Sequence, residues 1–438
     1  MKNKPLISIF VKQSTPRFHY AKYLIFELLL GLEADVYTDY KSFVALNTPK
    51  INYSNLKIAN SFHINPAPLL FDDTIEEIHL ESNLNNSITP VLFPTSEGDI
   101  NFDPLAAAFY IVSRYEEYLP HKRDQHNRYP ANQSILNQLD CLEVPIVQEW
   151  VEQLKKKLKA KFSTLSFHKP TFQYIPSFDI DMAWSFKAKG AYRTIGGYAK
   201  DIISINIAST KQRLKVNLGL QNDPFDQFEY FRLQTEKNGL EPIYFFLMGE
   251  YSDYDKNVHP NHPKFKQLIK NIASKYTTGI HPSYYYEKNI SQEIKTLHKI
   301  TNKTIELSRQ HFIKLSFPDT YQLLIKNKIK ADFSMGYPEK IGFRNGLSVP
   351  SLWYDLSTEQ TTDLMVHPFQ IMDVTLKNYL NLEPDQAIEK IKNIVNTIAR
   401  YGGTMISIWH NSSFDKDWIG WHKVFEEMLS YSSETIST

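Results

Sequence analysis

Apolar runs of strand length alternate with amphipathic stretches through the C-terminal part of the chain. Alternation of this kind favours a parallel sheet whose strands are connected by helices. We expect strands at residues 173–180, 242–248, 277–282, 305–309, 329–334, 363–367 and 403–410. We expect helices at residues 223–238, 263–275, 289–301, 319–328 and 384–401. Seven strands over roughly 250 residues match the size of a closed barrel with helices outside it.

The N-terminal part of the chain has a mixed pattern of one apolar run, short strand-like pieces and stretches with apolar residues at helical spacing. We expect a strand at residues 6–11, short strands from Val36 and Leu56, and helices at 20–32, 103–118 and 144–161. The domain boundary is placed where the Lys-rich helix ends and the segment beginning at Pro170 follows. The sequence therefore predicts a smaller mixed α/β domain of unknown role at residues 1–166 and a barrel at residues 167–438.

The composition is that of an ordinary folded protein. The chain has 438 residues, of which 42% are hydrophobic and 22% charged, and this length favours two domains. The net charge is +1 and no basic tract carries interleaved aromatics, which argues against a nucleic-acid partner. The single cysteine, Cys141, excludes a disulfide framework. The apolar run before Phe10 is too short for a signal peptide, and no run of 18 apolar residues predicts a membrane span, so we expect a cytoplasmic protein.

Five of the expected strands end in or near Asp or His side chains. Functional residues of such barrels collect at the carboxyl ends of the strands, and five polar ends are hard to explain by packing alone. These ends carry Asp179 and Asp181, His281, Arg309 and His311, His367, and His410.

The first of these ends holds two carboxylates on one face. Asp179 and Asp181 are two residues apart, so both side chains point to the same side of a strand. The pair would repel unless a cation or a proton lay between the two groups, although in isolation such a pair also fits a helix cap beside a solvated carboxylate. His281 adds an imidazole, and imidazole with carboxylate suits a divalent metal, with zinc the expected ion.

These motifs, in this order, resemble those of the polysaccharide deacetylase family, which has the NodB-homology fold of carbohydrate esterase family four. The resemblance covers roughly residues 172–425. The overall form, with a long N-terminal domain, looks like a divergent branch of polysaccharide deacetylase-like proteins found in bacterial surface-polysaccharide systems. It implies a distorted (β/α)7 barrel. In the segment SFDIDMAW it implies that Asp179 is the general base and Asp181 a metal ligand, and in GIHPSYY that His281 is a second ligand.

The chain departs from the family pattern at Tyr285, where the family has another metal-binding histidine. A replacement ligand must then come from elsewhere. His311 is favoured, because it would share a strand face with Arg309, which matches the family arginine that holds the base. His367 is the alternative. The last motif, ISIWHN, implies that His410 protonates the leaving amine.

The predicted activity is metal-dependent hydrolysis of an N-acetyl group on a sugar or polysaccharide. A metal-bound water would attack, and the metal with the backbone N–H of Tyr284 or Tyr285 would hold the oxyanion. Substrate contacts are expected from Arg344, Tyr285 and Trp409, although Arg344 fits a loop-holding role equally well. Asp373 is expected to orient His367 or His311.

Two other functions stay open at this stage. One is a non-catalytic carbohydrate-binding or scaffold protein with a degenerate deacetylase barrel. The other is an amidohydrolase acting on a non-sugar amide. In the N-terminal part, the segments around Arg114 and Arg128 are expected to form structural ion pairs. The sequence does not specify the oligomeric state or the substrate.

Overall fold

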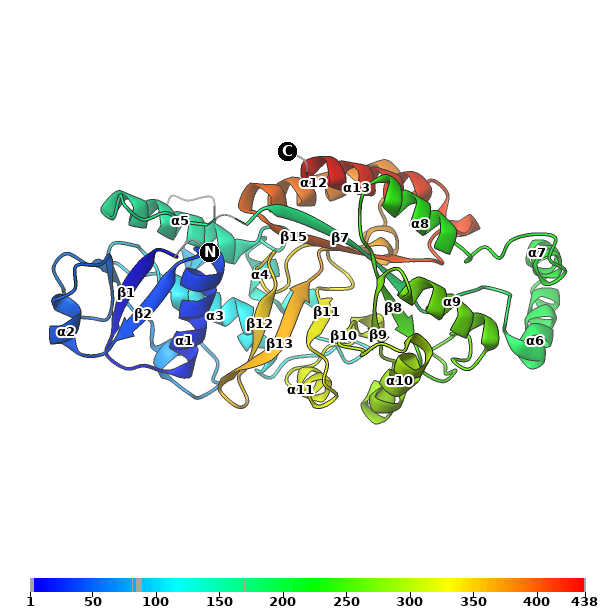
Figure 1. The fold of residues 1–438 in the computed structure, drawn as a ribbon, viewed down its shortest axis with the longest axis horizontal. Coiled ribbons are helices and arrows are strands. Elements are labelled where there is room, and N and C mark those ends of the chain that lie inside the picture. The colour runs from blue at the N-terminus through cyan, green and yellow to red at the C-terminus, as the bar shows by residue number, and fades with distance from the viewer. Residues whose placement is uncertain (1–3, 81, 84–88, 169, 206, 437–438) are drawn as a thin grey trace.

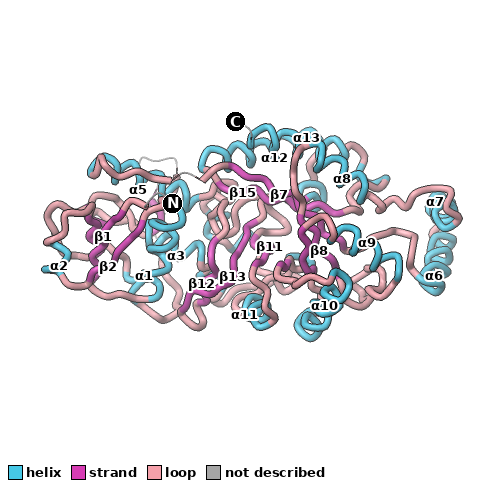
Figure 2. The backbone as a smooth tube through the Cα atoms, in the orientation of Figure 1, coloured by secondary structure: helices cyan, strands magenta, loops and turns pink. Residues whose placement is uncertain are grey.

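Two sheets organise the chain, one in each part (Figure 1). The computed structural model describes residues 4–80, 82–83, 89–168, 170–205 and 207–436. Residues 1–3, at the start of the segment considered for a signal peptide, lie outside these ranges. Strands, helices and loops are distinguished in Figure 2.

The N-terminal sheet is parallel, with the strand order β2-β1-β3-β4. Its strands are β1 (Leu6–Val11), β2 (Glu33–Tyr37), β3 (Lys50–Tyr53) and β4 (Phe62–Ile64), and β5 (Ser82–Asn83) pairs with β6 (Val91–Leu92) separately. The helices of this part are α1 (Pro16–Lys22), α2 (Tyr40–Val44), α3 (Pro104–Val112), α4 (Ile135–Gln138) and α5 (Ile146–Lys161). The mixed α/β class expected for this part is therefore confirmed.

Two local expectations for the N-terminal part were wrong. The segment starting at Leu56 is a loop, because side chains turn its backbone: Asn52 donates to the Leu56 carbonyl and Ser54 Oγ accepts from the Leu56 N–H. The helix expected at 103–118 ends at Val112, since Arg114 has a left-handed backbone with φ 57°. Its start is as predicted, with Asp103 accepting from two N–H groups of the first turn.

The C-terminal sheet has the order β12-β13-β11-β10-β9-β8-β7-β15-β14 and is parallel except at β12. Its strands are β7 (Phe172–Ile180), β8 (Ile243–Leu247), β9 (Thr277–His281), β10 (Leu307–Ser308), β11 (Ala331–Met335), β12 (Ser351–Asp355), β13 (Gln360–Pro368), β14 (Ile371–Met372) and β15 (Gly403–His410). The helices are α6 (Gly190–Ile203), α7 (Ile207–Asn217), α8 (Phe228–Lys237), α9 (Pro263–Ala273), α10 (Tyr286–Thr301), α11 (Asp319–Lys326), α12 (Pro384–Tyr401) and α13 (Trp421–Ile436). All seven expected strands and five expected helices are present; β12, β14, α6, α7 and α13 were not expected.

The C-terminal sheet is curled, and a short segment draws its two ends together. Between β13 and β14, Phe369 donates its N–H to Met335 of β11, while Gln370 exchanges hydrogen bonds with Ile406 of β15. Phe245 and Phe333 belong to a small apolar cluster on the inner face of the curled sheet. A larger cluster lies between the sheet and its helices. No ladder joins β13 to β14 within the described ranges, so closure into a (β/α)7 barrel stays a prediction.

A buried charge cluster joins the two parts of the chain. Glu117 accepts hydrogen bonds from Arg114 at 2.8 Å and from Arg344 at 3.0 and 2.6 Å, and all three side chains are almost fully buried. Burial alone would raise the pKa of Glu117, but Arg344 and Arg114 outweigh it and lower the pKa. The hydrophobic core of the N-terminal part also includes Leu347 and Val349. A division of the chain at residue 166 therefore stays a prediction.

We expect Glu117→Gln to lower the free energy of unfolding by about 3–5 kcal/mol, because it leaves the buried Arg344 guanidinium without its carboxylate and leaves Arg114 with Glu116 alone. Urea unfolding followed by circular dichroism measures this. Glu143→Gln is the matched control, since the exposed Glu143–Lys390 pair also joins the two parts, at 2.9 Å. It should cost less than about 1 kcal/mol. Equal effects for the two variants would contradict a stabilising role for the buried cluster.

Candidate active site

Parallel pairing brings the predicted polar residues to one edge of the sheet. In the β7–β15 ladder, Asp179 lies directly beside His410, and in the β8–β9 ladder His281 lies beside Leu247. Asp181 follows β7 immediately, and His311 begins a short 3₁₀ turn after β10. The expectation that His311 and Arg309 share a strand face was wrong, because β10 ends at Ser308.

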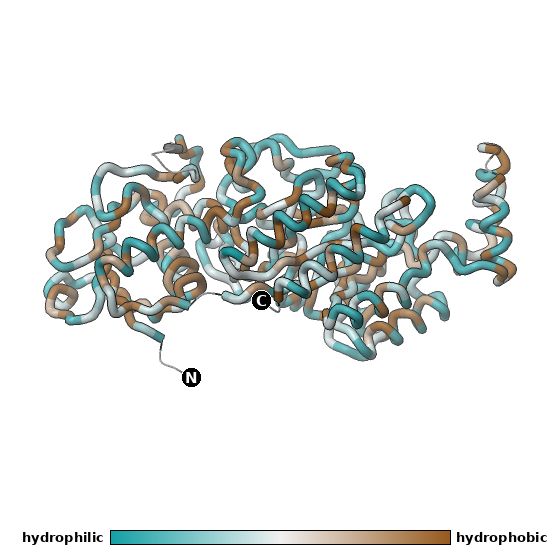
Figure 3. The backbone as a smooth tube through the Cα atoms, turned by 90° about the horizontal axis from the view of Figure 1, so that it is seen from above, coloured by the Kyte–Doolittle hydropathy of each residue, from teal (hydrophilic) through white to brown (hydrophobic). Residues whose placement is uncertain are grey.

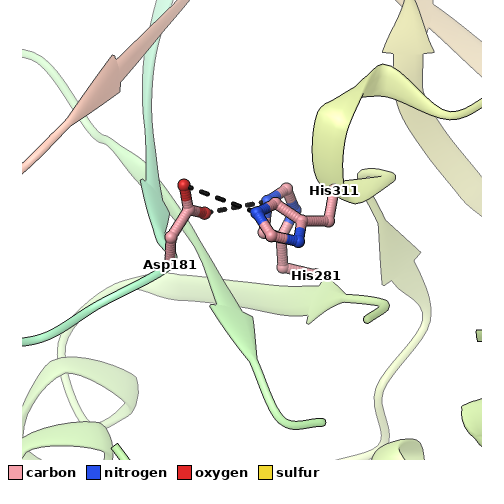
Figure 4. Close-up of side chains that lie close together, drawn as sticks. All are labelled: Asp181, His281 and His311. Carbon is pink, nitrogen blue, oxygen red and sulfur yellow. Dashed lines mark ion pairs between the residues drawn. The ribbon is translucent and has the colours of Figure 1, made fainter. Parts of the chain in front are cut away.

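Asp181, His281 and His311 form a compact cluster in which one ligand atom from each lies within 4.8 Å of the others (Figure 4). The Nε2 atom of His281 is 3.1 Å from Asp181 Oδ1, and the Nε2 atom of His311 is 3.7 Å from Asp181 Oδ2. His410 Nε2 is also 3.7 Å from Asp181 Oδ2. The structure thus brings together the three residues predicted as metal ligands, with the predicted acid beside them.

The outer nitrogen of each clustered histidine has an acceptor that fixes the ring. His281 Nδ1 is 2.6 Å from the Arg309 carbonyl, and His311 Nδ1 is 2.9 Å from Asp255 Oδ1. These contacts favour a proton on Nδ1, which leaves the Nε2 lone pairs directed at a carboxylate. With His281 Nε2 unprotonated, the buried Asp181 Oδ1 atom has no hydrogen-bond donor among the described residues, although that nitrogen lies 3.1 Å away. Two imidazole nitrogens and a carboxylate aimed at one another fit a divalent cation such as zinc.

Without a cation, protons hold this cluster together. Burial alone would lower the pKa of His311, but Asp181 and Asp255 outweigh it and raise the pKa to about 9. Burial would raise the pKa of Asp181, but His311 and His281 lower it well below its usual value. The cluster therefore attracts positive charge, which either a proton or a metal can supply.

Arg309 fixes Asp179 from below the site. Its Nη1 atom is 3.0 Å from Asp179 Oδ1 and 2.6 Å from Ser177 Oγ, and its Nε donates to the Phe333 carbonyl at 3.0 Å. Asp179 is only 2% exposed, so this ion pair lies in a dry environment. Arg309 therefore holds one carboxylate oxygen in place, as the resemblance implied.

His410 is oriented by Asp373, which accepts from His410 Nδ1 at 2.8 Å and from the His410 N–H at 2.7 Å. The expectation that Asp373 orients His367 or His311 was wrong, because Asp373 directly follows β14, which pairs with β15 and so places it beside His410. Burial alone would lower the pKa of His410, but Asp373 and Asp181 outweigh it and raise the pKa to about 10. His410 is therefore protonated at neutral pH.

A cavity of about 320 Å³ opens over these residues, which is the small end of the range for ligand pockets. Its walls include Asp179, Asp181, His281, His311 and His410. The N-terminal part contributes Arg128, which donates to the Phe312 carbonyl at 2.6 Å and pairs with Asp124 at 2.7 Å. Arg128 thus has the structural role expected of it and also lines the cavity.

Three predicted substrate or oxyanion contacts lie elsewhere. Arg344 is buried against Glu117, because the loop after β11 turns it toward the N-terminal part. Trp409 is fully buried among Phe425 and Trp421, since alternation along β15 points it to the helix side of the sheet. The Tyr284 N–H donates to Asp255 at 3.0 Å and is therefore engaged. All three roles are corrected accordingly.

Tyr285 and His367 also lie outside the cluster. Tyr285 is half exposed just before α10 and does not line the cavity. The centroid of its ring lies 6.2 Å from that of Tyr254. His367 stacks on Phe333 at 4.3 Å, and burial together with Arg309 lowers its pKa to about 4. His367 is therefore a neutral residue of the inner cluster in this structure.

Asp255 is the main site residue that the sequence did not reveal. It accepts from His311 and from Tyr284, and burial raises its pKa less than these partners lower it. It lies in the loop after β8, eight residues beyond Leu247. The only signal in the sequence was an acidic residue in the loop after a strand. The prediction considered strand ends alone and therefore missed Asp255.

Comparisons with known proteins leave the activity open. A model of a family of unknown function, DUF7033, matches residues 7–163, in the N-terminal part. No curated protein matches the chain. Similar solved structures include a candidate polysaccharide deacetylase from Mycobacterium smegmatis (12% identity, TM-score 0.40, covering 61% of this chain and 86% of the other), a polysaccharide deacetylase from Bacillus cereus (10%, 0.29, 61% and 88%) and a 7,8-dihydropteroate synthase from Vibrio fischeri (10%, 0.30, 61% and 92%). Likeness at this level assigns neither a family nor an activity. Separately, none of the helices in the described ranges is both long and apolar enough to cross a membrane.

We expect Asp373→Asn to lower the pKa of His410 from about 10 toward its ordinary value, because the nearest anion is removed. Since the native pKa is raised, the imidazolium should persist at neutral pH in the wild type and be lost only as the pH rises toward 10. NMR titration of the metal-free protein measures both values. An unchanged pKa in Asp373→Asn would contradict the assigned pairing.

Proposed function

We propose that this protein hydrolyses an N-acetyl group on a sugar or polysaccharide with the help of a divalent metal, zinc being the expected ion. The observation that carries the proposal is the cluster of Asp181, His281 and His311, with Asp179 and His410 in the walls of the same cavity. The proposal also takes the curled sheet as a distorted (β/α)7 barrel of the polysaccharide deacetylase type and residues 1–166 as an extra domain.

Asp181 and the Nε2 atoms of His281 and His311 would hold the metal. The donor set would be one carboxylate and two neutral imidazoles, which suits a catalytic divalent ion. When bound, such an ion polarises a carbonyl oxygen and lowers the pKa of a coordinated water. Asp255 and the Arg309 carbonyl keep the two rings in the orientation that binding needs.

Asp179 would act as the general base. Arg309 fixes one of its carboxylate oxygens, and the carboxylate keeps further lone pairs that can accept a proton from the attacking water. The buried guanidinium also prevents the side chain from rotating away. The base is therefore positioned before substrate arrives, which is the condition for efficient proton transfer.

His410 would act as the general acid. Asp373, the largest favourable contributor to its raised pKa, favours the imidazolium form, so a proton is ready for the nitrogen of the leaving amine. Asp373 holds Nδ1–H and thereby directs Nε2–H toward the cavity. After the proton leaves, the imidazole stays neutral beside Asp373 until it is reprotonated from solvent.

We expect His311→Ala to weaken zinc binding more than about 100-fold, because losing a direct ligand exceeds the 10–100-fold cost of losing an outer partner. Asp255→Asn should fall within that 10–100-fold range, since it removes only the partner of His311. Competition with a chromogenic chelator measures the affinities. His367→Ala is the matched control and should bind zinc as the wild type does. Loss of zinc from His367→Ala with retention in His311→Ala would contradict the ligand assignment.

We expect the zinc-loaded protein to release acetate from N-acetylhexosamine oligomers, and Asp179→Asn to lower kcat about 10²–10⁴-fold by removing the base. Enzymatic determination of acetate measures the rate. Asp253→Asn, at an exposed position near the cavity, is the control and should leave the rate unchanged. Substoichiometric zinc together with no acetate would contradict the proposal and favour a non-catalytic carbohydrate-binding protein. Zinc binding without acetate release would favour an amide substrate that is not a sugar.

A further inference from the structure

A helical arm, α6–α7, extends from the C-terminal part at the end opposite the N-terminal sheet (Figures 1 and 3). It is inserted between β7 and α8, so the chain enters it shortly after Asp181. Of the described residues of these two helices, only Asp201 and Val216 are buried. The arm therefore takes little part in either hydrophobic core.

The outer face of α6 is apolar although it lies in solvent. Tyr192, Ile195, Ile202 and Ile203 fall on one side of the helix at helical spacing. Tyr192 is 94% exposed and Ile203 is 83% exposed. Single exposed apolar residues are common, but a continuous stripe of them marks an interaction surface.

The second helix repeats this arrangement. Ile207 and Leu214 lie on one exposed face of α7, and Leu218 continues that face just beyond the helix. Lys211 and Lys215 are exposed on or beside the same face. Long lysine side chains next to an apolar stripe can bury their stems and keep the ammonium groups in water.

The polar sides of the two helices face each other instead. Asp201 of α6 pairs with Arg213 of α7 at 2.9 Å and accepts from Ser209 at 3.1 Å. A Cβ placed on Gly197 would lie 2.4 Å from the Arg213 guanidinium, so glycine permits this close contact. The arm is thus polar inside and apolar outside, the reverse of a helical hairpin that is stable in water alone.

The arm also concentrates positive charge. Between Lys187 and Asn217 the sequence has seven lysines and arginines and one acidic residue, Asp201, in a chain whose net charge is only +1. A second copy of the arm would bring like charges together, which disfavours self-association through this face. Exposed apolar side chains flanked by lysines are instead complementary to an anionic lipid surface.

We propose that α6–α7 is a membrane-docking arm that lies in the interface of an anionic bilayer, with its isoleucine and leucine face among the acyl chains and its lysines at the headgroups. It does not cross the bilayer. The proposal rests on the arm alone and does not depend on the proposed hydrolysis.

Hydrogen bonds hold the base of the arm beside the cavity that Asp181 lines. The Asp223 carboxylate accepts from the N–H groups of Ser185, Phe186 and Lys187 at 2.8–2.9 Å. Arg193 donates to the carbonyls of Lys256 and Asn257 at 2.9 and 2.8 Å. Lys256 lines the cavity. Docking of the arm would therefore hold the cavity close to the lipid surface.

Vesicle co-sedimentation of the full-length protein tests this inference. The probes are vesicles of phosphatidylcholine alone and vesicles in which part of the phosphatidylcholine is replaced by phosphatidylglycerol. We expect binding to the anionic vesicles only, weakened by added salt. Ile195→Ser/Ile203→Ser should lower the partition coefficient at least about tenfold, because apolar area leaves the acyl region. Lys211→Glu/Lys215→Glu should lower it as well.

Ile419→Ser is the matched control, because Ile419 is 85% exposed but lies outside the arm. It should bind as the wild type does, and circular dichroism should show all variants folded. Failure of the wild type to bind anionic vesicles would overturn the proposal, as would equal binding by the wild type and the isoleucine variant. A dimer in sedimentation velocity that the isoleucine variant abolishes, without vesicle binding, would assign the face to a second copy instead.

Discussion

The site depends on one carboxylate, Asp181, that faces the Nε2 atoms of three histidines; its Oδ1 atom is buried, although the side chain as a whole is 34% exposed. His281 lies at 3.1 Å, and His311 and His410 each lie at 3.7 Å. Positive charge beside Asp181 compensates for the hydration that the buried oxygen has lost. In the metal-free protein, the imidazoles of His311 and His410, whose pKa values are raised, supply this charge. A divalent ion supplies it more strongly and frees the histidines to bind through their lone pairs.

The partners behind the histidines divide their roles. The Nδ1 atom of His311 contacts the Asp255 carboxylate, and that of His281 contacts the Arg309 carbonyl. Both rings therefore direct Nε2 toward Asp181. His410 also presents Nε2, but Asp373 holds it on another strand and its pKa is raised to about 10. Environment thus separates the two proposed ligands from the proposed acid among side chains of one type. Arg309 links the two groups, since its carbonyl orients His281 while its guanidinium fixes Asp179.

Much of this arrangement follows from the sequence, because local pattern and strand order determine it. The strand-like runs and their polar ends predicted that the Asp and His side chains would collect at one edge of the sheet. The choice of His311 over His367 came from the family resemblance and from a strand face shared with Arg309, which proved wrong. Contacts distant in sequence could not be predicted in this way. Arg344 finds Glu117 across 227 residues, and Asp255 reaches His311 from a loop without periodic pattern. Trp409 was misplaced because the prediction did not apply strand alternation, which puts Trp409 on the face opposite its neighbour His410.

The arm lies next to the cavity because the chain runs from Asp181, in the cavity wall, into α6. Arg193 of α6 also donates a hydrogen bond to the carbonyl of Lys256, which lines the cavity. The sequence pattern between β7 and α8 did not reveal the arm, because the apolar residues of α6 and α7 point away from both hydrophobic cores. The same inversion makes it a candidate contact with lipid. Chemistry and docking can therefore be tested separately, one by metal and acetate, the other by vesicles.

The central claim is that Asp181, His281 and His311 bind one divalent ion. An anomalous difference map from zinc-soaked crystals, recorded at the zinc absorption edge, tests this most directly. The account predicts a peak within bonding distance of both Nε2 atoms and the Asp181 carboxylate. A map with no peak there, or with its main peak at His367, would contradict it.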